Sequence, residues 1–304
     1  MEPVLTEAAR AEAAATDDSP SAADFATPTA PATAREKEQR LIAWLAARSS
    51  VMLGFSGGVD SAYLACVALE AIGPSRFLAV IGRSPSYPDA QWDGARALAA
   101  KFDIPVLEVR THEMADPRYV ANPSNRCYFC KTELWSVLRA VADERGFQTI
   151  IDGTNADDTN DWRPGRRAAD EHAVSSPLAE LGFTKDEIRA LSKARGLPTW
   201  SQPSSPCLSS RLPYGSVVTI ERLRQVERAE AALRALGIEG DLRVRHHGDL
   251  ARVEISADRL DAWLAAPNVR AITAAVREAG FARVSVDLRG FRSGSLNVIA
   301  PAGA

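Results

Sequence analysis

Three cysteines lie in sequence contexts that are typical of reactive or metal-binding thiols. Cys127 and Cys130 are three residues apart in NRCYFCK, a spacing used by redox pairs, zinc sites and iron–sulfur clusters. Cys207 lies in the irregular stretch PSSPCLSSRLPYG, with Arg211 four residues later. A neighbouring guanidinium stabilises a thiolate, which is the nucleophilic form of cysteine. These thiols therefore indicate sulfur chemistry, with Cys207 as the reactive residue and Arg211 as its partner.

A second candidate site is the glycine-rich stretch GFSGGVDSA. Gly57 and Gly58 permit a tight turn that aims backbone N–H groups at one point, and Ser56 and Ser61 add hydroxyl donors. The ordinary phosphate loop, GxxxxGK[ST], carries a Lys that is missing here. Asp60 instead suits Mg²⁺ that neutralises a pyrophosphate leaving group. This stretch predicts a nucleotide site for ATP and Mg²⁺.

Short apolar runs alternate with helical patterns around these motifs, which predicts a doubly wound α/β fold with a parallel sheet. The expected strands are 51–55, 77–83, 106–110 and 149–154. The expected helices are 36–50, 62–72, 88–102, a stretch from the CxxC pair to about Arg145, and 182–198. Thr184 and Glu187 form a capping-box pattern at the start of the last helix. Ligands of such sheets bind at the carboxyl ends of the strands, where GFSGGVDSA lies.

The rest of the chain divides into a tail and a second domain. Residues 1–35 have the composition of a disordered tail, and 36–205 form the expected α/β domain. Residues 206–304 are expected to form a small α+β domain for substrate binding or oligomerisation. Its predicted elements are a helix (219–236), a hairpin (242–256), two short helices (257–279) and a strand (283–288).

Composition narrows the class of protein. The chain has 304 residues, 46% hydrophobic and 25% charged, with a formal net charge of −3. A negative net charge disfavours nucleic acid as a partner. No apolar run approaches the roughly 18 residues of a membrane helix, so no membrane association is expected. The absence of a secretory pattern and the four cysteines predict a cytoplasmic protein with reduced thiols.

SGGVDS is the signature of the PP-loop ATP pyrophosphatases, and the chain resembles that superfamily. The segment DGTNADD, at the end of the fourth expected strand, is similar to its second nucleotide-binding element. The resemblance implies cleavage of ATP to AMP and pyrophosphate with adenylation of a substrate. The ATP-binding residues that it implies are Ser56, Gly57, Gly58, Val59, Asp60, Ser61, Gly153, Thr154 and Asn155, with Asp60 both catalytic and a metal ligand.

NRCYFCK, DGTNADD, DWRPG and PCLSSRLPYG together resemble the sacrificial sulfur transferases of the LarE type, over roughly residues 36–295. Members of that family act in nickel-pincer nucleotide cofactor synthesis. They adenylate a carboxylate of pyridinium-3,5-biscarboxylic acid mononucleotide and pass sulfur to it from a cysteine. The matching cysteine here is Cys207.

The resemblance also reaches the second domain. The family's paired phosphate-binding arginines fall on Arg243 and Arg245, which share one side of a strand. Glu254 on the partner strand is a candidate metal ligand. The implied partners are a small nucleotide substrate, other enzymes of the nickel-pincer pathway, and copies of the chain itself, with a hexamer suspected.

Two interpretations of the cysteines stay open. Cys127, Cys130 and Cys207 could hold a [4Fe–4S] cluster and leave one iron free for an extra sulfide. Alternatively, Cys207 gives up its own sulfur and becomes dehydroalanine, and the CxxC pair is a bystander. Zinc lacks a nearby fourth ligand. Cys207 is essential in either case.

Three other functions compete with sulfur transfer to a small molecule. A PP-loop tRNA thiolase would need a basic RNA-binding face, which the net charge disfavours. A PP-loop amide synthetase, of the kind that makes NAD or GMP, would not need Cys207. A nucleotide sensor would not release pyrophosphate stoichiometrically.

Overall fold

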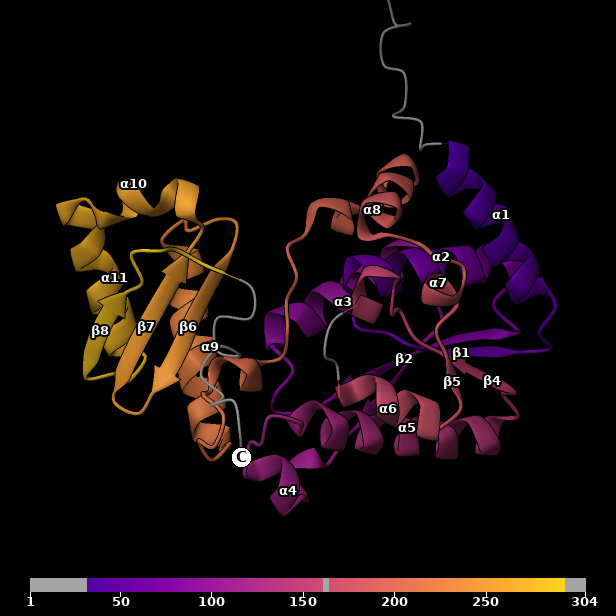
Figure 1. Cartoon of the computed structure of the whole chain (residues 1–304), viewed down its shortest axis with the longest axis horizontal. Helices are drawn as coiled ribbons and strands as arrows, with labels where there is room; N and C mark the ends of the chain where they lie inside the picture. The colour runs from indigo at the N-terminus through magenta and orange to yellow at the C-terminus, as the bar shows by residue number, and fades with distance from the viewer. Residues whose placement is uncertain (1–31, 161–163, 293–304) are drawn as a thin grey trace, which may run out of the picture.

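The computed structural model describes residues 32–160 and 164–292, which form a larger α/β domain and a smaller α+β domain (Figure 1). The strands of the larger domain are β1 (Val51–Gly54), β2 (Phe77–Arg83), β3 (Val106–Arg110), β4 (Thr149–Ile151) and β5 (Val174–Ser175). Its helices are α1 (Ala32–Ala46), α2 (Val59–Ile72), α3 (Asp89–Lys101), η1 (Glu113–Ala115), α4 (Pro117–Val120), α5 (Arg126–Arg145), η2 (Asp157–Asn160), α6 (Pro164–Glu171), α7 (Pro177–Glu180), α8 (Lys185–Ala194) and η3 (Pro198–Ser201).

All strands of the larger sheet are parallel, in the order β3-β2-β1-β4-β5. The predicted doubly wound α/β fold is thus confirmed. The chain moves outward from β1 to β3 and then adds β4 and β5 on the other side of β1. At such a reversal, the carboxyl ends of the two central strands open a crevice for ligands. The segments that leave β1 and β4 there are GFSGGVDSA and DGTNADD.

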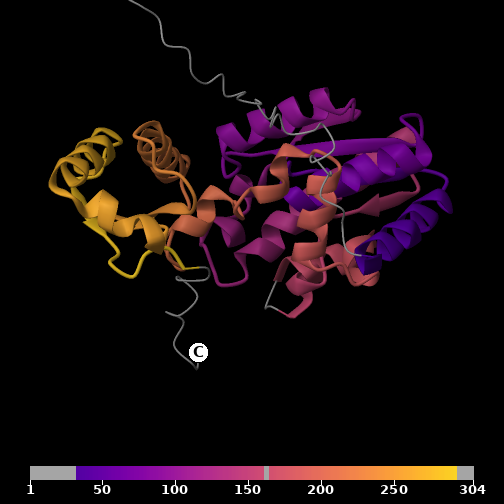
Figure 2. The same ribbon diagram turned by 90° about the horizontal axis from the view of Figure 1, so that it is seen from above.

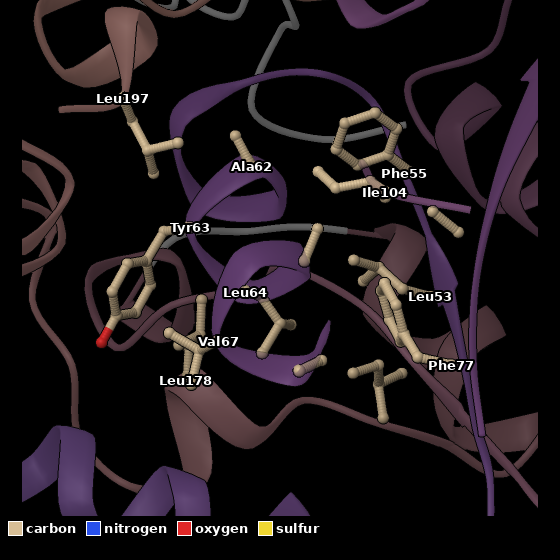
Figure 3. Close-up of a cluster of buried hydrophobic side chains, with 14 of the residues drawn as sticks. Leu53, Phe55, Ala62, Tyr63, Leu64, Val67, Phe77, Ile104, Leu178 and Leu197 are labelled. Atoms are coloured by element: carbon tan, nitrogen blue, oxygen red, sulfur yellow. The ribbon is translucent and has the colours of Figure 1, made fainter. Parts of the chain in front are cut away.

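Helices cover both faces of this sheet (Figure 1). Leu53, on one face of β1, belongs to a core that α1, α2, α3 and α8 complete. Figure 3 shows part of this core around α2. Met52, on the opposite face, packs with Trp135 of α5 and Ala168 of α6. The central strands β1 and β2 are nearly continuous apolar runs buried on both faces, which is typical of parallel sheets.

The smaller domain has a three-stranded sheet of β6 (Leu242–His247), β7 (Leu250–Ile255) and β8 (Arg283–Val286). The first two strands form the predicted antiparallel hairpin, and β8 adds parallel to β7. The helices of this part are η4 (Leu208–Arg211), α9 (Ile220–Ala235), η5 (Ala257–Arg259), α10 (Leu260–Leu264) and α11 (Ala266–Glu278). α9 and α11 both contribute side chains to the core beneath the sheet.

The two domains lie side by side (Figure 2), and they share apolar and polar contacts. Tyr119 is buried in the core of the smaller domain, and Phe129 and Cys130 pack against it. Arg224 of α9 is ion-paired with Asp89 of α3, at 2.9 Å. The start of the CxxC helix is therefore held against the smaller domain.

Some boundaries differ from those predicted. α1 begins at Ala32, before the expected start at Glu36, and residues 1–31 of the expected tail lie outside the described ranges. β4 ends at Ile151, so DGT belongs to the loop that follows it. β5 was not predicted, because two residues carry no periodic signal. Within the described ranges, no helix has the length and apolar character needed to span a bilayer.

Candidate active site

The loop between β1 and α2 has a backbone that only glycine adopts easily. Gly57 has φ = 69°, in the left-handed region. A Cβ at this position would also lie 2.6 Å from the Cβ of Ala95 on α3. The side chain of Val59 is buried in the core below, so the loop is anchored at its exit. A fixed, tight turn at a helix N-terminus is the geometry that binds phosphate through backbone N–H groups.

The two serines of the loop hold it in shape. The backbone N–H of Ser56 donates to Ser61 Oγ at 3.3 Å, and the two hydroxyl oxygens are 3.1 Å apart. Ser61 Oγ also donates to the carbonyl of Gly58 at 3.2 Å. These hydroxyls were predicted as phosphate donors, and in this structure they form contacts within the loop.

Asp60 faces two polar groups from distant parts of the chain. Asn155 Nδ2 donates to Asp60 Oδ1 at 3.2 Å. The Nζ of Lys185, the first residue of α8, forms an ion pair with Asp60 Oδ2. The nucleotide loop lacks a lysine of its own, but α8 supplies one from 125 residues further along the chain. Sequence reasoning missed Lys185, although it follows the N-cap of the predicted capping box.

The segment after β4 packs directly on the nucleotide loop. A Cβ on Gly153 would lie 3.0 Å from the backbone nitrogen of Ser61, so glycine permits this close approach. Thr154 donates through its hydroxyl to Asp152 Oδ2 at 2.8 Å, and Ser176 donates to Asp152 Oδ1 at 2.8 Å. The structure therefore brings together the residues predicted from SGGVDS and DGTNADD.

The three predicted thiols also lie together. Cys130 and Cys207 are half-buried, and Cys127 is exposed as a residue. Burial raises the pKa of Cys130, and the nearby Glu113, Cys207 and Cys127 act on it as charges. Burial and the neighbouring Cys207 likewise raise the pKa of Cys127, while Arg126 opposes this shift. CxxC at the start of α5 thus meets Cys207 in the loop before η4.

Arg211 does not lie where it was expected. It forms a bidentate ion pair with Glu230, with Nε–Oε1 and Nη2–Oε2 both at 2.9 Å. Its Nη1 donates to the carbonyl oxygen of Cys207 at 3.1 Å. Arg211 therefore holds the backbone of the cysteine loop. The guanidinium beside the thiols is that of Arg126, which sequence reasoning also missed.

A buried carboxylate lies near Cys130. Glu113 is 2% exposed, and its Oε1 accepts a hydrogen bond from Ser86 Oγ at 3.0 Å. Its Oε2 is buried and has no hydrogen-bond partner among the described residues. Tyr119 shares a hydrogen bond of 2.5 Å with Ser209, just beyond Cys207. Cys130 therefore lies near a buried polar group as well as against the apolar core of the smaller domain.

One short segment connects the thiols to the nucleotide loop. The carbonyl of Ser86 accepts from the backbone N–H of Leu208, next to Cys207, at 2.8 Å. The hydroxyl of the adjacent Tyr87 donates to the carbonyl of Ser56 at 2.8 Å. Cys207 and the nucleotide loop are therefore tied to neighbouring residues of the turn after β2.

The two arginines of β6 have different surroundings. Arg245 donates through Nε to Glu254 Oε2 at 2.9 Å, and Arg252 donates to Glu254 Oε1 at 3.0 Å. Glu254 is fully buried, so a metal ion would compete with two guanidinium groups for its oxygens. Arg243 is 4% exposed and donates to the carbonyls of Leu242 and Ser204.

Arg243 lacks a carboxylate partner among the described residues. Burial and the positive charge of Arg211 lower the pKa of Arg243 to about 10. A buried, crowded guanidinium of this kind has capacity to bind an added anion.

Zinc and a [4Fe–4S] cluster are the two metal groups that the thiols could hold. Within residues 32–160 and 164–292, no three His, Cys, Asp or Glu side chains form a group that could hold a metal ion. This finding bears on a single ion such as zinc. In a four-iron cluster each thiolate binds a different iron, so its ligands stand further apart. Three thiols can bind three of the four irons of such a cluster, so the residues present fit it.

Comparisons with known proteins agree with this geometry. The family model described as NAD synthase matches residues 41–124, which hold the nucleotide loop. An uncharacterised protein of Synechocystis sp. is 43% identical over 81% of this chain and 91% of its own length. The pyridinium-3,5-bisthiocarboxylic acid mononucleotide synthase of Lactiplantibacillus plantarum is 35% identical over 88% of this chain and 95% of its own length. One component of the glutamine-hydrolysing GMP synthase of Methanosphaerula palustris is 24% identical over 62% of this chain and 64% of its own length.

Proposed function

The chain belongs to the family of the pyridinium-3,5-bisthiocarboxylic acid mononucleotide synthase, the LarE-type ATP-dependent sulfur transferases, and on that premise we propose that it carries out the same overall reaction. A carboxylate oxygen of pyridinium-3,5-biscarboxylic acid mononucleotide attacks the α-phosphorus of ATP, and pyrophosphate leaves. A sulfur nucleophile then attacks the activated carboxyl carbon, and AMP leaves with the original oxygen. The product is a thiocarboxylate for nickel-pincer cofactor synthesis.

The nucleotide loop supports the first step. Its N–H groups at the start of α2 are placed to bind the phosphates of ATP, with Gly153, Thr154 and Asn155 beside them. Asp60 would serve the Mg²⁺ that accompanies ATP, and this ion neutralises charge on the leaving pyrophosphate. Lys185 would then exchange its contact with Asp60 for one with a phosphate oxygen.

Sulfur is handled at Cys207, in one of two ways. Cys127, Cys130 and Cys207 would hold a [4Fe–4S] cluster, which when bound supplies a site for an additional sulfide. The grouping of the three thiols supports this arrangement. In the alternative, the Cys207 thiolate attacks the acyl adenylate itself. A base then removes the Cα proton, the Cβ–S bond breaks, and dehydroalanine stays in the chain.

Arg243 is the residue that we propose for the phosphate of the substrate. It lies in the smaller domain and forms no ion pair with a carboxylate within the described ranges, although Glu230 and Asp241 act on it as charges. Arg245 lies beside it but is neutralised by Glu254. A metal role for Glu254 remains a prediction.

The wider setting of the enzyme is also a proposal. We propose that copies of the chain assemble into an oligomer, with a hexamer as the first candidate, and that its product passes to other enzymes of the nickel-pincer pathway. Exposed apolar side chains at Val217 and Ile220 are consistent with assembly. A cytoplasmic location remains a prediction of the sequence.

The observation that carries the proposal is the link from Cys207 to the nucleotide loop through Ser86 and Tyr87. It favours a thiol close to the site where an acyl adenylate would form. The test is anaerobic turnover with ATP and the biscarboxylic acid mononucleotide, followed by mass spectrometry of the products. We expect AMP, pyrophosphate and a thiocarboxylate in equal amounts. Formation of ADP would overturn the proposed adenylation.

A further inference from the structure

Arg126 joins the two segments that carry the cysteines. It is the first residue of α5, directly before Cys127, and it is 3% exposed. Its Nη1 donates to Asn122 Oδ1 at 2.5 Å and to the carbonyl of Ser209 at 2.8 Å. Ser209 lies two residues after Cys207. One buried guanidinium thus ties the start of the CxxC helix to the segment that follows Cys207.

The charge of Arg126 has no carboxylate beside it within the described ranges. The buried Arg211 is paired with Glu230, and the buried Arg245 with Glu254. The groups that act electrostatically on Arg126 are instead the thiols of Cys207 and Cys127 and the phenols of Tyr119 and Tyr214. The positive charge of Arg126 in turn lowers the pKa of the Cys127 thiol, against the effect of burial. Burying a cation without a paired carboxylate is costly, so negative charge on the nearby sulfur atoms would stabilise Arg126.

We propose that Arg126 tunes the iron–sulfur cluster at Cys127, Cys130 and Cys207 by placing a fixed positive charge close to its sulfur ligands. The inference rests on the cluster assigned under the proposed function. Net charge and hydrogen bonds to sulfur set the reduction potential of such clusters. A [4Fe–4S]²⁺ core with three thiolates carries −1, and −2 after reduction by one electron. A cation stabilises the more negative state, so Arg126 raises the reduction potential.

The test compares Arg126→Gln, which removes the charge, with Arg126→Lys, which keeps it. Arg139→Gln is the matched control, because Arg139 lies on the same helix and contacts the carbonyl of His172. Each full-length protein is reconstituted anaerobically with iron and sulfide. Iron content, visible absorbance and the midpoint potential from an EPR-monitored titration are then measured.

We expect Arg126→Gln to lower the midpoint potential by at least about 59 mV. For a one-electron couple, this shift is a tenfold change in the ratio of reduced to oxidised cluster at a given potential. Arg126→Lys should stay close to the wild type, and Arg139→Gln should match it. A Gln variant with a full cluster and the wild-type potential would overturn the proposal.

Loss of the cluster is also informative. If the Gln variant loses iron while the Lys variant retains it, the charge is required and the proposal stands. If both variants lose iron, Arg126 acts only by holding the two segments together, and the proposal fails. If the wild-type protein binds no iron, the cluster itself is wrong and the proposed function loses it. This outcome is seen in the wild type alone, so it is distinct from a failure of the role given to Arg126.

Discussion

Lys185 Nζ is ion-paired with Asp60 Oδ2, which joins the first turn of α8 to the centre of the nucleotide loop. The lysine that ordinary phosphate loops carry within their own sequence thus comes here from a distant helix. Its side chain is about one third exposed, so it can move when a phosphate arrives.

We predict that Lys185→Ala slows pyrophosphate release by about 10- to 100-fold, which corresponds to about 1.5–3 kcal/mol for a charge-assisted hydrogen bond. The measurement is coupled pyrophosphate detection at saturating ATP. The control is Lys37→Ala, since Lys37 contacts the same helix through Glu187 at 2.7 Å but lies away from Asp60. Equal rates for wild type and Lys185→Ala would contradict the role given to this lysine. Asp60→Ala should abolish turnover without unfolding the protein.

Two glycine substitutions should have opposite effects. Gly57→Ala forces a residue with a Cβ into φ = 69° and against Ala95, so it should destabilise the fold by about 1–3 kcal/mol and abolish ATP binding. Gly94→Ala, inside α3 with no atom near its Cβ position, should stabilise by about 0.5–1 kcal/mol. Urea unfolding and calorimetric titration with ATP measure the two effects. Normal ATP affinity in Gly57→Ala would show that the loop backbone does not bind phosphate.

Arg243→Ala should weaken binding of the nucleotide substrate by about 1.5–3 kcal/mol and leave ATP affinity nearly unchanged. Arg245→Ala should behave differently, because it removes one of the two guanidinium groups that neutralise the buried Glu254. Breaking a buried pair costs about 3–5 kcal/mol, so this variant should lose stability as well. Substrate titration and thermal unfolding separate the two. Equal loss of stability in both variants would make Arg243 a structural residue.

The mass of the protein after one turnover distinguishes the two fates of Cys207. If Cys207 gives up its sulfur, the residue should become lighter by one H₂S. If it binds a cluster, the mass should stay constant, and Cys127→Ala and Cys130→Ala should lose both iron and activity. Intact-protein mass spectrometry with peptide mapping makes the measurement. Thiocarboxylate formation by a Cys207→Ala protein would contradict both.

The elements around the nucleotide site could be predicted because their signals are local. The strands β2 and β3 have the predicted limits, since each is a continuous apolar or alternating run with clear breaks. The capping box of α8 is present as predicted. The Thr184 side chain accepts a hydrogen bond from the backbone N–H of Glu187, and the Glu187 side chain accepts one from the backbone N–H of Thr184. Alternation of strands and helices predicted a parallel sheet with ligands at the carboxyl ends of its strands, and the strand order then places SGGVDS beside DGTNADD.

The partners of the charged residues could not be predicted, because they depend on packing between distant segments. Arg211 is near Cys207 in sequence, but the 3₁₀ turn η4 directs it to Glu230 on α9. Arg126 reaches the thiols because α5 begins against the smaller domain. Neither arrangement has a local sign in the sequence. Residues 161–163 of DWRPG lie outside the described ranges, so this part of the family resemblance stays a prediction.

The core shared by the two domains has a consequence for biosynthesis. Tyr119, Phe129 and Cys130 pack against apolar residues as far along the chain as Phe281. A ribosome adding about 5–20 residues per second leaves these side chains uncovered for roughly 10–30 s. We expect stalled nascent chains that end at residue 205 to recruit chaperones more strongly than completed chains do. Equal recruitment would mean that the first domain masks this surface by itself until translation ends.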